Sequence, residues 1–211
     1  MMKSMSTTEQ KSQYKMVSTF QRLVETQFSG DINALCWRRN PIGDFQEIAS
    51  QLKINENITE IFIEDLNQLQ LSENGKLARK FIIQDLQFLT DYETQPSLNI
   101  LKNYERDDEF DFISTDVYSY HVDRSPIESD TFLCTYFGAS GDIIPNDQVQ
   151  QKILIPEIRE QLKILFNGPE SEFEHFLKEN YFDLHYQAIP NAKSTNFGYG
   201  NLWRLSIDHP R

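Results

Sequence analysis

The hydrophobic pattern of this chain changes its period at Pro96, and that change limits the folds that the chain can adopt. Before Pro96, apolar residues recur at the three- and four-residue spacing of an amphipathic helix, in residues 45–52 and again in residues 77–89. After Pro96, short runs alternate apolar and polar side chains, as in SLNILKNYE and TDVYSYHVD. Helices followed by several short strands are typical of an α+β domain whose sheets form a sandwich or barrel.

The same pattern predicts how the chain is divided. Residues 1–15 are polar and lack the apolar segment of a signal peptide, so we expect a disordered tail before a single domain over residues 16–211. Within that domain, we expect residues 16–95 to be mainly helical and residues 96–208 to form the sheets, with a helical insertion at about 153–180. The stretch ITEIFIEDLNQLQL fits either period, and we assign it to a helix.

Charge and cysteine content exclude several classes of protein. The chain has 20 basic and 32 acidic residues, a net charge of −12, and a surface of that sign repels nucleic-acid phosphates. No apolar run approaches the roughly 20 residues needed to cross a bilayer, so no membrane partner is expected. Cys36 and Cys134 lie in apolar stretches without a CxxC spacing, which predicts free thiols in a reducing, cytoplasmic environment.

His121 and Asp123 are the first candidate site residues. On a strand, side chains two residues apart point to the same face, which would place an imidazole beside a carboxylate. On a helix the two would diverge by roughly 200°. The β-branched and aromatic residues upstream and the nearby Pro126 favour the strand. The alternative for this pair is a structural hydrogen bond at the end of a strand.

A third ligand would turn this pair into a metal site. His185 lies in FDLHYQAI, a stretch with strand alternation that suits a rigid ligand, although a core histidine is the alternative. His175 lies in a helical pattern, and His209 is close to the C-terminus, where chains fray. Two histidines and one carboxylate that leave open positions form the facial triad that binds iron(II) in non-haem oxygenases.

Arg204 and Ser206 form a second pair at strand spacing, in WRLSID. A guanidinium binds a carboxylate through two parallel hydrogen bonds, and the serine hydroxyl would lie on the same face. An arginine among apolar neighbours needs an anionic partner, because an unpaired buried charge is costly. That partner would be either a bound dicarboxylate or a carboxylate of the chain itself.

Taken together, HxD at His121 and Asp123, the later His185, and RxS at Arg204 and Ser206 resemble the pattern of the iron(II)- and 2-oxoglutarate-dependent dioxygenases. The resemblance covers roughly residues 96–208. It implies a double-stranded β-helix, a jelly-roll or cupin-like barrel, with the helical region packed against it. More loosely, CWRR, YHVDRSP, CTYFGASGD and LWRLSID resemble an uncharacterised bacterial family, a domain of unknown function of the DUF1826 type.

The resemblance to the dioxygenases also implies a role for each residue. His121, Asp123 and His185 would hold Fe(II), and Arg204 with Ser206 would bind the far carboxylate of 2-oxoglutarate. Dioxygen and a small molecule, amino acid or peptide would be the other substrates. The separation between His185 and Arg204 is longer than is usual in the family, so Lys102 and Arg124 stay open as alternative anchors.

Two other classes of function fit the same residues. A cupin-type metal enzyme would use the triad without 2-oxoglutarate. A non-catalytic interaction module would use its acidic surface to bind a basic partner.

Overall fold

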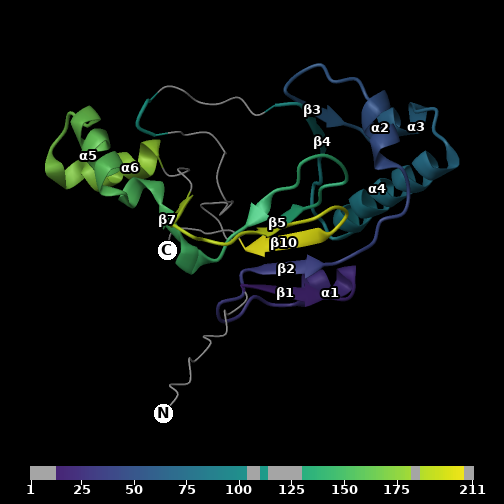
Figure 1. Cartoon of the computed structure of the whole chain (residues 1–211), viewed down its shortest axis with the longest axis horizontal. Coiled ribbons are helices and arrows are strands. Elements are labelled where there is room, and N and C mark those ends of the chain that lie inside the picture. The colour runs from purple at the N-terminus through teal and green to yellow at the C-terminus, as the bar shows by residue number, and fades with distance from the viewer. Residues whose placement is uncertain (1–12, 104–109, 114–129, 182–185, 207–211) are drawn as a thin grey trace, which may run out of the picture.

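The structure is a computed structural model, and it describes residues 13–103, 110–113, 130–181 and 186–206. It is a mixed α+β arrangement of several small sheets, and the strands in these ranges do not close into a barrel. A four-stranded sheet lies in the middle of the molecule, with one group of helices at each end (Figure 1).

The central sheet contains β1 (Tyr14–Val17), β2 (Ala34–Trp37), β10 (Leu202–Ser206) and β5 (Asp130–Leu133), in that order. β1 runs parallel to β2, whereas β10 runs antiparallel to both β2 and β5. Trp203 of β10 lies opposite Cys36 on one side and Leu133 on the other. The two middle strands are therefore contributed by residues that lie far apart in the sequence.

Strand alternation gives the central sheet two buried faces. Ala34 and Cys36 of β2 pack with Trp203 and Leu205 of β10 on one face. On the other face, one cluster contains Leu23, Leu35 and Leu202, and Leu23 belongs to α1 (Phe20–Glu25). Arg204 follows the alternation of Leu202, so its side chain lies on the face that α1 covers.

One helical group packs around a two-stranded sheet. Its elements are α2 (Phe45–Gln51), β3 (Ile58–Ile61), α3 (Ile63–Gln68), α4 (Glu73–Asp91) and β4 (Leu98–Leu101). Asp44 and Ser72 cap α2 and α4, each accepting a hydrogen bond from a backbone N–H of the first turn. Ile48, Ile61, Leu66, Ala78 and Ile82 form the core of this group.

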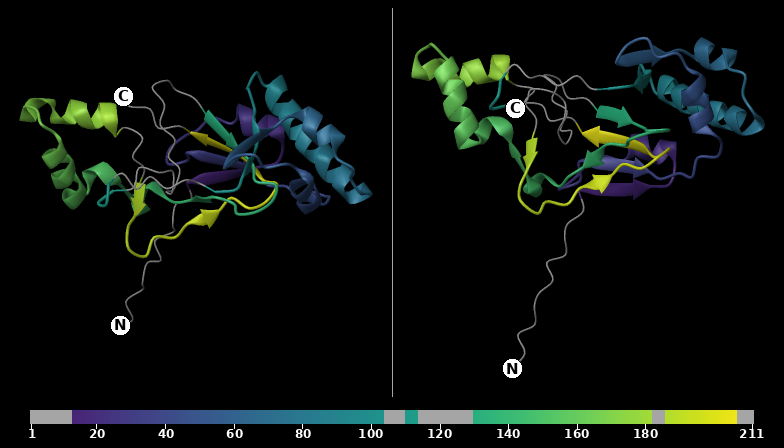
Figure 2. Two further views of the ribbon diagram at one scale, coloured as in Figure 1. Left: turned by 90° about the horizontal axis from the view of Figure 1, so that it is seen from above. Right: turned by 45° about the horizontal axis from the view of Figure 1, so that its top comes forward.

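The other helical group lies beyond β7, as the two views of Figure 2 also show. Its elements and the short strands near it are β6 (Asp142–Ile143), η1 (Asn146–Gln148), β7 (Val149–Gln151), η2 (Lys152–Leu154), α5 (Pro156–Leu165), η3 (Glu170–Glu172), α6 (Phe173–Asn180), β8 (Tyr186–Ala188) and β9 (Thr195–Asn196). β6 pairs with β9, and β7 with β8, both antiparallel. Leu162 and Leu177 join Phe173 and Ile113 in its core.

The structure confirms the α+β class and the helices predicted at residues 45–52, 77–89 and 153–180. It differs in the first half, where β1 and β2 lie in a region expected to be mainly helical. β1 also begins inside the predicted tail. In ITEIFIEDLNQLQL, the helical assignment holds for α3 but not for β3, whose Ile61 is buried against β4 and α4. Tertiary packing decides between the two periods there.

The longest helix in the described ranges is α4, with 19 residues, and it is amphipathic. None of the helices in these ranges is both long and apolar enough to span a bilayer.

Candidate functional site

The three expected metal ligands, His121, Asp123 and His185, lie outside the residues that the structure describes. What the structure shows is where the chain continues after them. β5 begins at Asp130, seven positions after Asp123, and β8 begins at Tyr186, directly after His185. Within the described ranges, no group of three or more histidine, cysteine, aspartate or glutamate side chains is arranged to hold a metal ion.

β5 and β8 belong to sheets that polar contacts join. The first residue of β5 lies opposite Ser206, the last residue of β10. The backbone N–H of Ser206 donates to the carbonyl oxygen of Asn33 at 2.8 Å, and the Asn33 amide donates to Asn146 Oδ1 at 3.3 Å. Asn146 begins the short turn that leads into β7, the partner of β8. The C-terminal end of β10 accordingly points toward the side of the molecule where β7 lies (Figure 1).

Arg204 is buried, and its guanidinium binds groups of the chain itself. Nε donates to Asp130 Oδ2 at 2.5 Å. Nη1 donates to three carbonyl oxygens at the end of α1, those of Leu23 at 3.1 Å, Val24 at 2.7 Å and Thr26 at 3.1 Å. The guanidinium carbon also lies 4.9 Å from the centre of the Phe28 ring. The side chain of Arg204 thus caps the C-terminal end of α1.

This arrangement has a clear physical reason. The last carbonyl oxygens of a helix have no partner within it and carry the negative end of the helix dipole. A buried cation satisfies them, and Asp130 supplies the opposite charge that burial requires. Of the two partners that the sequence leaves open for Arg204, the structure provides the carboxylate of the chain. Lys102, the alternative anchor, is exposed and follows the last residue of β4.

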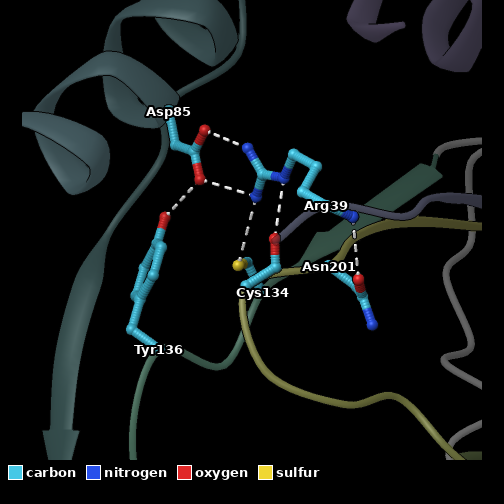
Figure 3. Close-up of polar contacts among 6 residues, drawn as sticks. Arg39, Asp85, Cys134, Tyr136 and Asn201 are labelled. Carbon is cyan, nitrogen blue, oxygen red and sulfur yellow. Dashed lines mark hydrogen bonds and ion pairs between the residues drawn. The ribbon is translucent and has the colours of Figure 1, made fainter. Parts of the chain in front are cut away.

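A second buried charge pair joins α4 to the central sheet (Figure 3). Arg39, just after β2, donates from Nη1 to Asp85 Oδ1 at 2.5 Å and from Nη2 to Asp85 Oδ2 at 2.8 Å. The Tyr136 hydroxyl donates to Asp85 Oδ2 at 2.9 Å. The side chains of Arg39 and Asp85 are only 8% and 3% exposed, so this bidentate pair lies inside the protein.

The other contacts of Arg39 fix its position from both sides. Nε donates to the carbonyl oxygen of Gly200 at 2.7 Å, and the backbone N–H donates to Asn201 Oδ1 at 3.0 Å. The guanidinium carbon lies 4.6 Å from the ring centre of Trp37 and 4.6 Å from that of Phe81. Contacts of this kind between a cation and aromatic rings are stabilising when water is excluded.

The pKa values of the residues around Arg39 and Asp85 indicate a structural role for this cluster rather than a reactive one. Burial raises the pKa of the Cys134 thiol to about 12, and burial also raises the pKa of Tyr136 well above its usual value. Burial alone would lower the pKa of Arg39, but the hydrogen bond and charge of Asp85 outweigh it and raise that pKa. At neutral pH the thiol is therefore protonated and is a poor nucleophile.

Sequence reasoning did not select Arg39 or Asp85, yet one signal points to them. Asp85 occupies a position of the apolar face of α4, following Ala78 and Ile82 and preceding Leu89 at helical spacing. A carboxylate on that face must find a cation or several donors. Arg39 follows a strand whose first three residues are buried, so it lies close enough to the core to be that cation.

No protein-family model, no curated protein and no solved structure matches this chain.

Proposed function

We propose that this chain is a non-haem iron(II) oxygenase of the 2-oxoglutarate-dependent type that acts on a small molecule, an amino acid or a polypeptide. The observation that carries the proposal is the order of His121, Asp123 and His185 along the chain, in two stretches of strand character that each lead into a strand. In this proposal the short sheets belong to a double-stranded β-helix of the cupin-like kind.

The donor set suits iron(II). Two imidazoles and one carboxylate are three protein ligands, which leaves open positions for further ligands. When bound, iron(II) with 2-oxoglutarate would supply the oxidising chemistry, in which dioxygen converts the cosubstrate to succinate and carbon dioxide and hydroxylates the substrate. The part of the protein is to present both imidazoles in the neutral form and the Asp123 side chain as a carboxylate.

Arg204, as the structure has it, is already bound to groups of the chain itself. Its Nε already binds Asp130 and its Nη1 already binds the carbonyl oxygens at the end of α1. An incoming carboxylate would have to compete with Asp130. Arg204 with Ser206 serves as the anchor in this proposal if 2-oxoglutarate displaces Asp130. Lys102, which is exposed after β4, and Arg124, which lies outside the described residues, are the alternative anchors.

The pairing of Arg204 with Asp130 favours a second candidate function. A cupin-type enzyme would use the same triad to bind a metal ion but would need no cation for a dicarboxylate. The two candidates share the metal and differ in the cosubstrate, so one titration distinguishes them.

The test is an anaerobic titration of the purified chain with iron(II), followed by 2-oxoglutarate. We expect stoichiometric iron binding at micromolar concentration, and then the visible charge-transfer absorption of 2-oxoglutarate bound to iron. The variants His121→Ala, Asp123→Ala and His185→Ala should lose iron binding. His175→Ala is the matched control, because His175 is exposed on α6, and it should bind iron as the parent does. Removal of residues 208–211 tests His209 in the same way.

The outcomes distinguish the two enzyme classes, test the three metal ligands and identify the anchor of the cosubstrate. Iron binding without the charge-transfer band would favour the cupin-type enzyme. Unaltered iron binding in Asp123→Ala would contradict the triad itself and, with it, both candidates. If the band appears, its loss in Lys102→Ala but not in Arg204→Ala would assign the anchor to Lys102.

A further inference from the structure

The β3–β4 sheet has one face in the core and one face exposed. Thr59 of β3 lies opposite Ile100 of β4, and Ile61 lies opposite Leu98. Ile61, Leu98 and Ile100 pack into the core around α4. The opposite face, which we call the β3–β4 outer face, contains the remaining side chains of the two strands and the residue after β3, which continues the extended backbone. Its members are Ile58, Glu60, Phe62, Asn99 and Leu101.

Three of the five side chains on this outer face are large, apolar and exposed to solvent. Ile58 is 49% exposed and Leu101, its direct partner across the two strands, is 45% exposed. Phe62 is 57% exposed at the end of β3. Cross-strand neighbours on one face lie about 5 Å apart between Cβ atoms, so Ile58 and Leu101 form one continuous apolar surface. Contiguous exposed apolar side chains are a common feature of interaction sites, although single exposed apolar residues are ordinary on protein surfaces.

One edge of the same sheet, that of β3, has no strand partner among the residues that the structure describes. The backbone N–H of Lys102 donates to the carbonyl oxygen of Asn57 at 2.8 Å, which places that pair in a hydrogen-bonded position of the ladder. By the alternation of antiparallel ladders, the backbone groups of Ile58 and Glu60 point away from β4. No strand in the described ranges pairs with that side of β3. An exposed edge can bind a further strand from another chain.

The charge around the outer face indicates what kind of chain this would be. Residues 54–65 contain the carboxylates of Glu56, Glu60, Glu64 and Asp65 and no lysine or arginine. Lys53 lies just before this range, and Lys102 lies directly after β4. Glu60 lies on the outer face itself, between Ile58 and Phe62. Among the ion pairs between described residues, none involves Glu56, Glu60 or Glu64. These carboxylates are therefore available to cationic side chains of a ligand.

We propose that the β3–β4 outer face and the adjacent edge of β3 bind an extended, basic segment of a partner protein. The segment would add to β3 as a further strand, with main-chain hydrogen bonds to Ile58 and Glu60. Its apolar side chains would cover Ile58, Leu101 and Phe62, and its lysine or arginine side chains would pair with the carboxylates. None of the residues that form this surface belongs to the proposed metal site.

Electrostatics disfavour the other simple occupants of this face. A second copy of the chain would place its own Glu60 and Glu64 close to those of the first across a symmetric contact, and like charges repel. Anionic lipid surfaces and nucleic-acid backbones carry the same sign as this face. A basic protein segment supplies both the cations and the apolar side chains.

The test uses the full chain and a labelled synthetic peptide that alternates lysine with valine and threonine, followed by fluorescence anisotropy. The reference peptide replaces every lysine by glutamate. Glu60→Lys and Phe62→Ser change the outer face. Their matched controls are Glu179→Lys on α6, which changes the net charge equally, and Ile164→Ser on α5, which is 75% exposed. Thermal melts of all four variants check that each is folded.

We expect the basic peptide to bind in a salt-dependent manner and the acidic peptide not to bind. Glu60→Lys and Phe62→Ser should each weaken binding by about tenfold or more, whereas both controls should leave it within about twofold. Equal weakening by Glu60→Lys and Glu179→Lys would mean that the peptide senses only net charge and would overturn the proposal. Concentration-dependent self-association that Phe62→Ser abolishes would assign the face to a second copy and would overturn it too.

Discussion

Replacement of Asp85 by alanine should strongly destabilise the fold, because Asp85 is the only carboxylate bound to the buried guanidinium of Arg39 among the described residues. The substitution removes both oxygens of the bidentate pair and also the acceptor of the Tyr136 hydroxyl. Arg39 would keep its hydrogen bond to Gly200 and its contacts with the Trp37 and Phe81 rings. It would lose its counter-charge in a site that water barely reaches.

The size of the effect follows from these contacts. Removal of one partner of a buried ion pair costs about 3–5 kcal/mol in the free energy of unfolding, since the remaining charge is left uncompensated. The contacts that Arg39 keeps favour the lower end, about 3 kcal/mol. Domains are stable by about 5–15 kcal/mol, so the Asp85→Ala variant should still fold. The urea concentration at the midpoint of its unfolding should be clearly lower than that of the parent.

The assay is equilibrium unfolding in urea, monitored by tryptophan fluorescence and circular dichroism. Tyr136→Phe removes a single hydrogen bond to the same carboxylate and should cost about 1–3 kcal/mol. Glu73→Ala is the control on the same helix: its pair with Lys76 is exposed, so the midpoint should hardly change. Arg39→Met combined with Asp85→Leu should be less destabilised than the sum of the two single changes, because apolar side chains replace the whole pair.

Two results would refute this reasoning. One is an Asp85→Ala midpoint equal to that of Glu73→Ala, which would mean that the pair is exposed in solution. The other is strict additivity of Arg39→Met and Asp85→Leu, because residues in direct contact should be coupled.

Three further changes probe other parts of the fold. Arg204→Ala should lower the free energy of unfolding by about 3 kcal/mol or more, because Asp130 and the end of α1 lose the cation that they share. The measurement is unfolding in urea, and an unchanged midpoint would mean that the pair contributes nothing to stability. Burial raises the pKa of Cys134 to about 12, so its contribution to stability is complete below pH 9 and is lost as the pH rises toward 12. Cys134→Ala should therefore reduce the slope of stability against pH in that range, measured by unfolding in urea at several pH values, and an unchanged slope would contradict the assignment. Gly43→Ala should lower the melting temperature, because at φ +131° a Cβ would lie 2.3 Å from the backbone nitrogen of Ala78, and an unchanged melt would exclude that contact.

The helices could be predicted from the sequence because their apolar faces and caps are local. α2 begins after Asp44, which directly precedes the periodic stretch 45–52. α4 begins after Ser72, a cap residue that lies a few positions before the periodic stretch 77–89. β2 could not be predicted in the same way. Its first three residues are all buried, so ALCW shows no alternation, and a short apolar run does not distinguish a strand from a helix.

The candidate site was predictable only in part for a related reason. Residue types and spacing select His121, Asp123 and His185 as a donor set, and that selection remains a prediction. The partners of a buried charge depend instead on contacts between elements far apart in the sequence. Arg39 and Asp85 are separated by 46 positions, and no local pattern links them.

Arg204 shows what the sequence can and cannot decide about a buried cation. Its apolar neighbours require an anion nearby, and that requirement holds whether the anion is a ligand or part of the chain. The choice depends on Asp130, 74 positions earlier, and on the carbonyl oxygens of α1, about 180 positions earlier. Because these groups converge on one guanidinium, the same side chain ties β10 to the beginning of β5 and to the end of α1. Any ligand that recruits Arg204 must replace this bonding, so a binding site there would be coupled to the order of the central sheet.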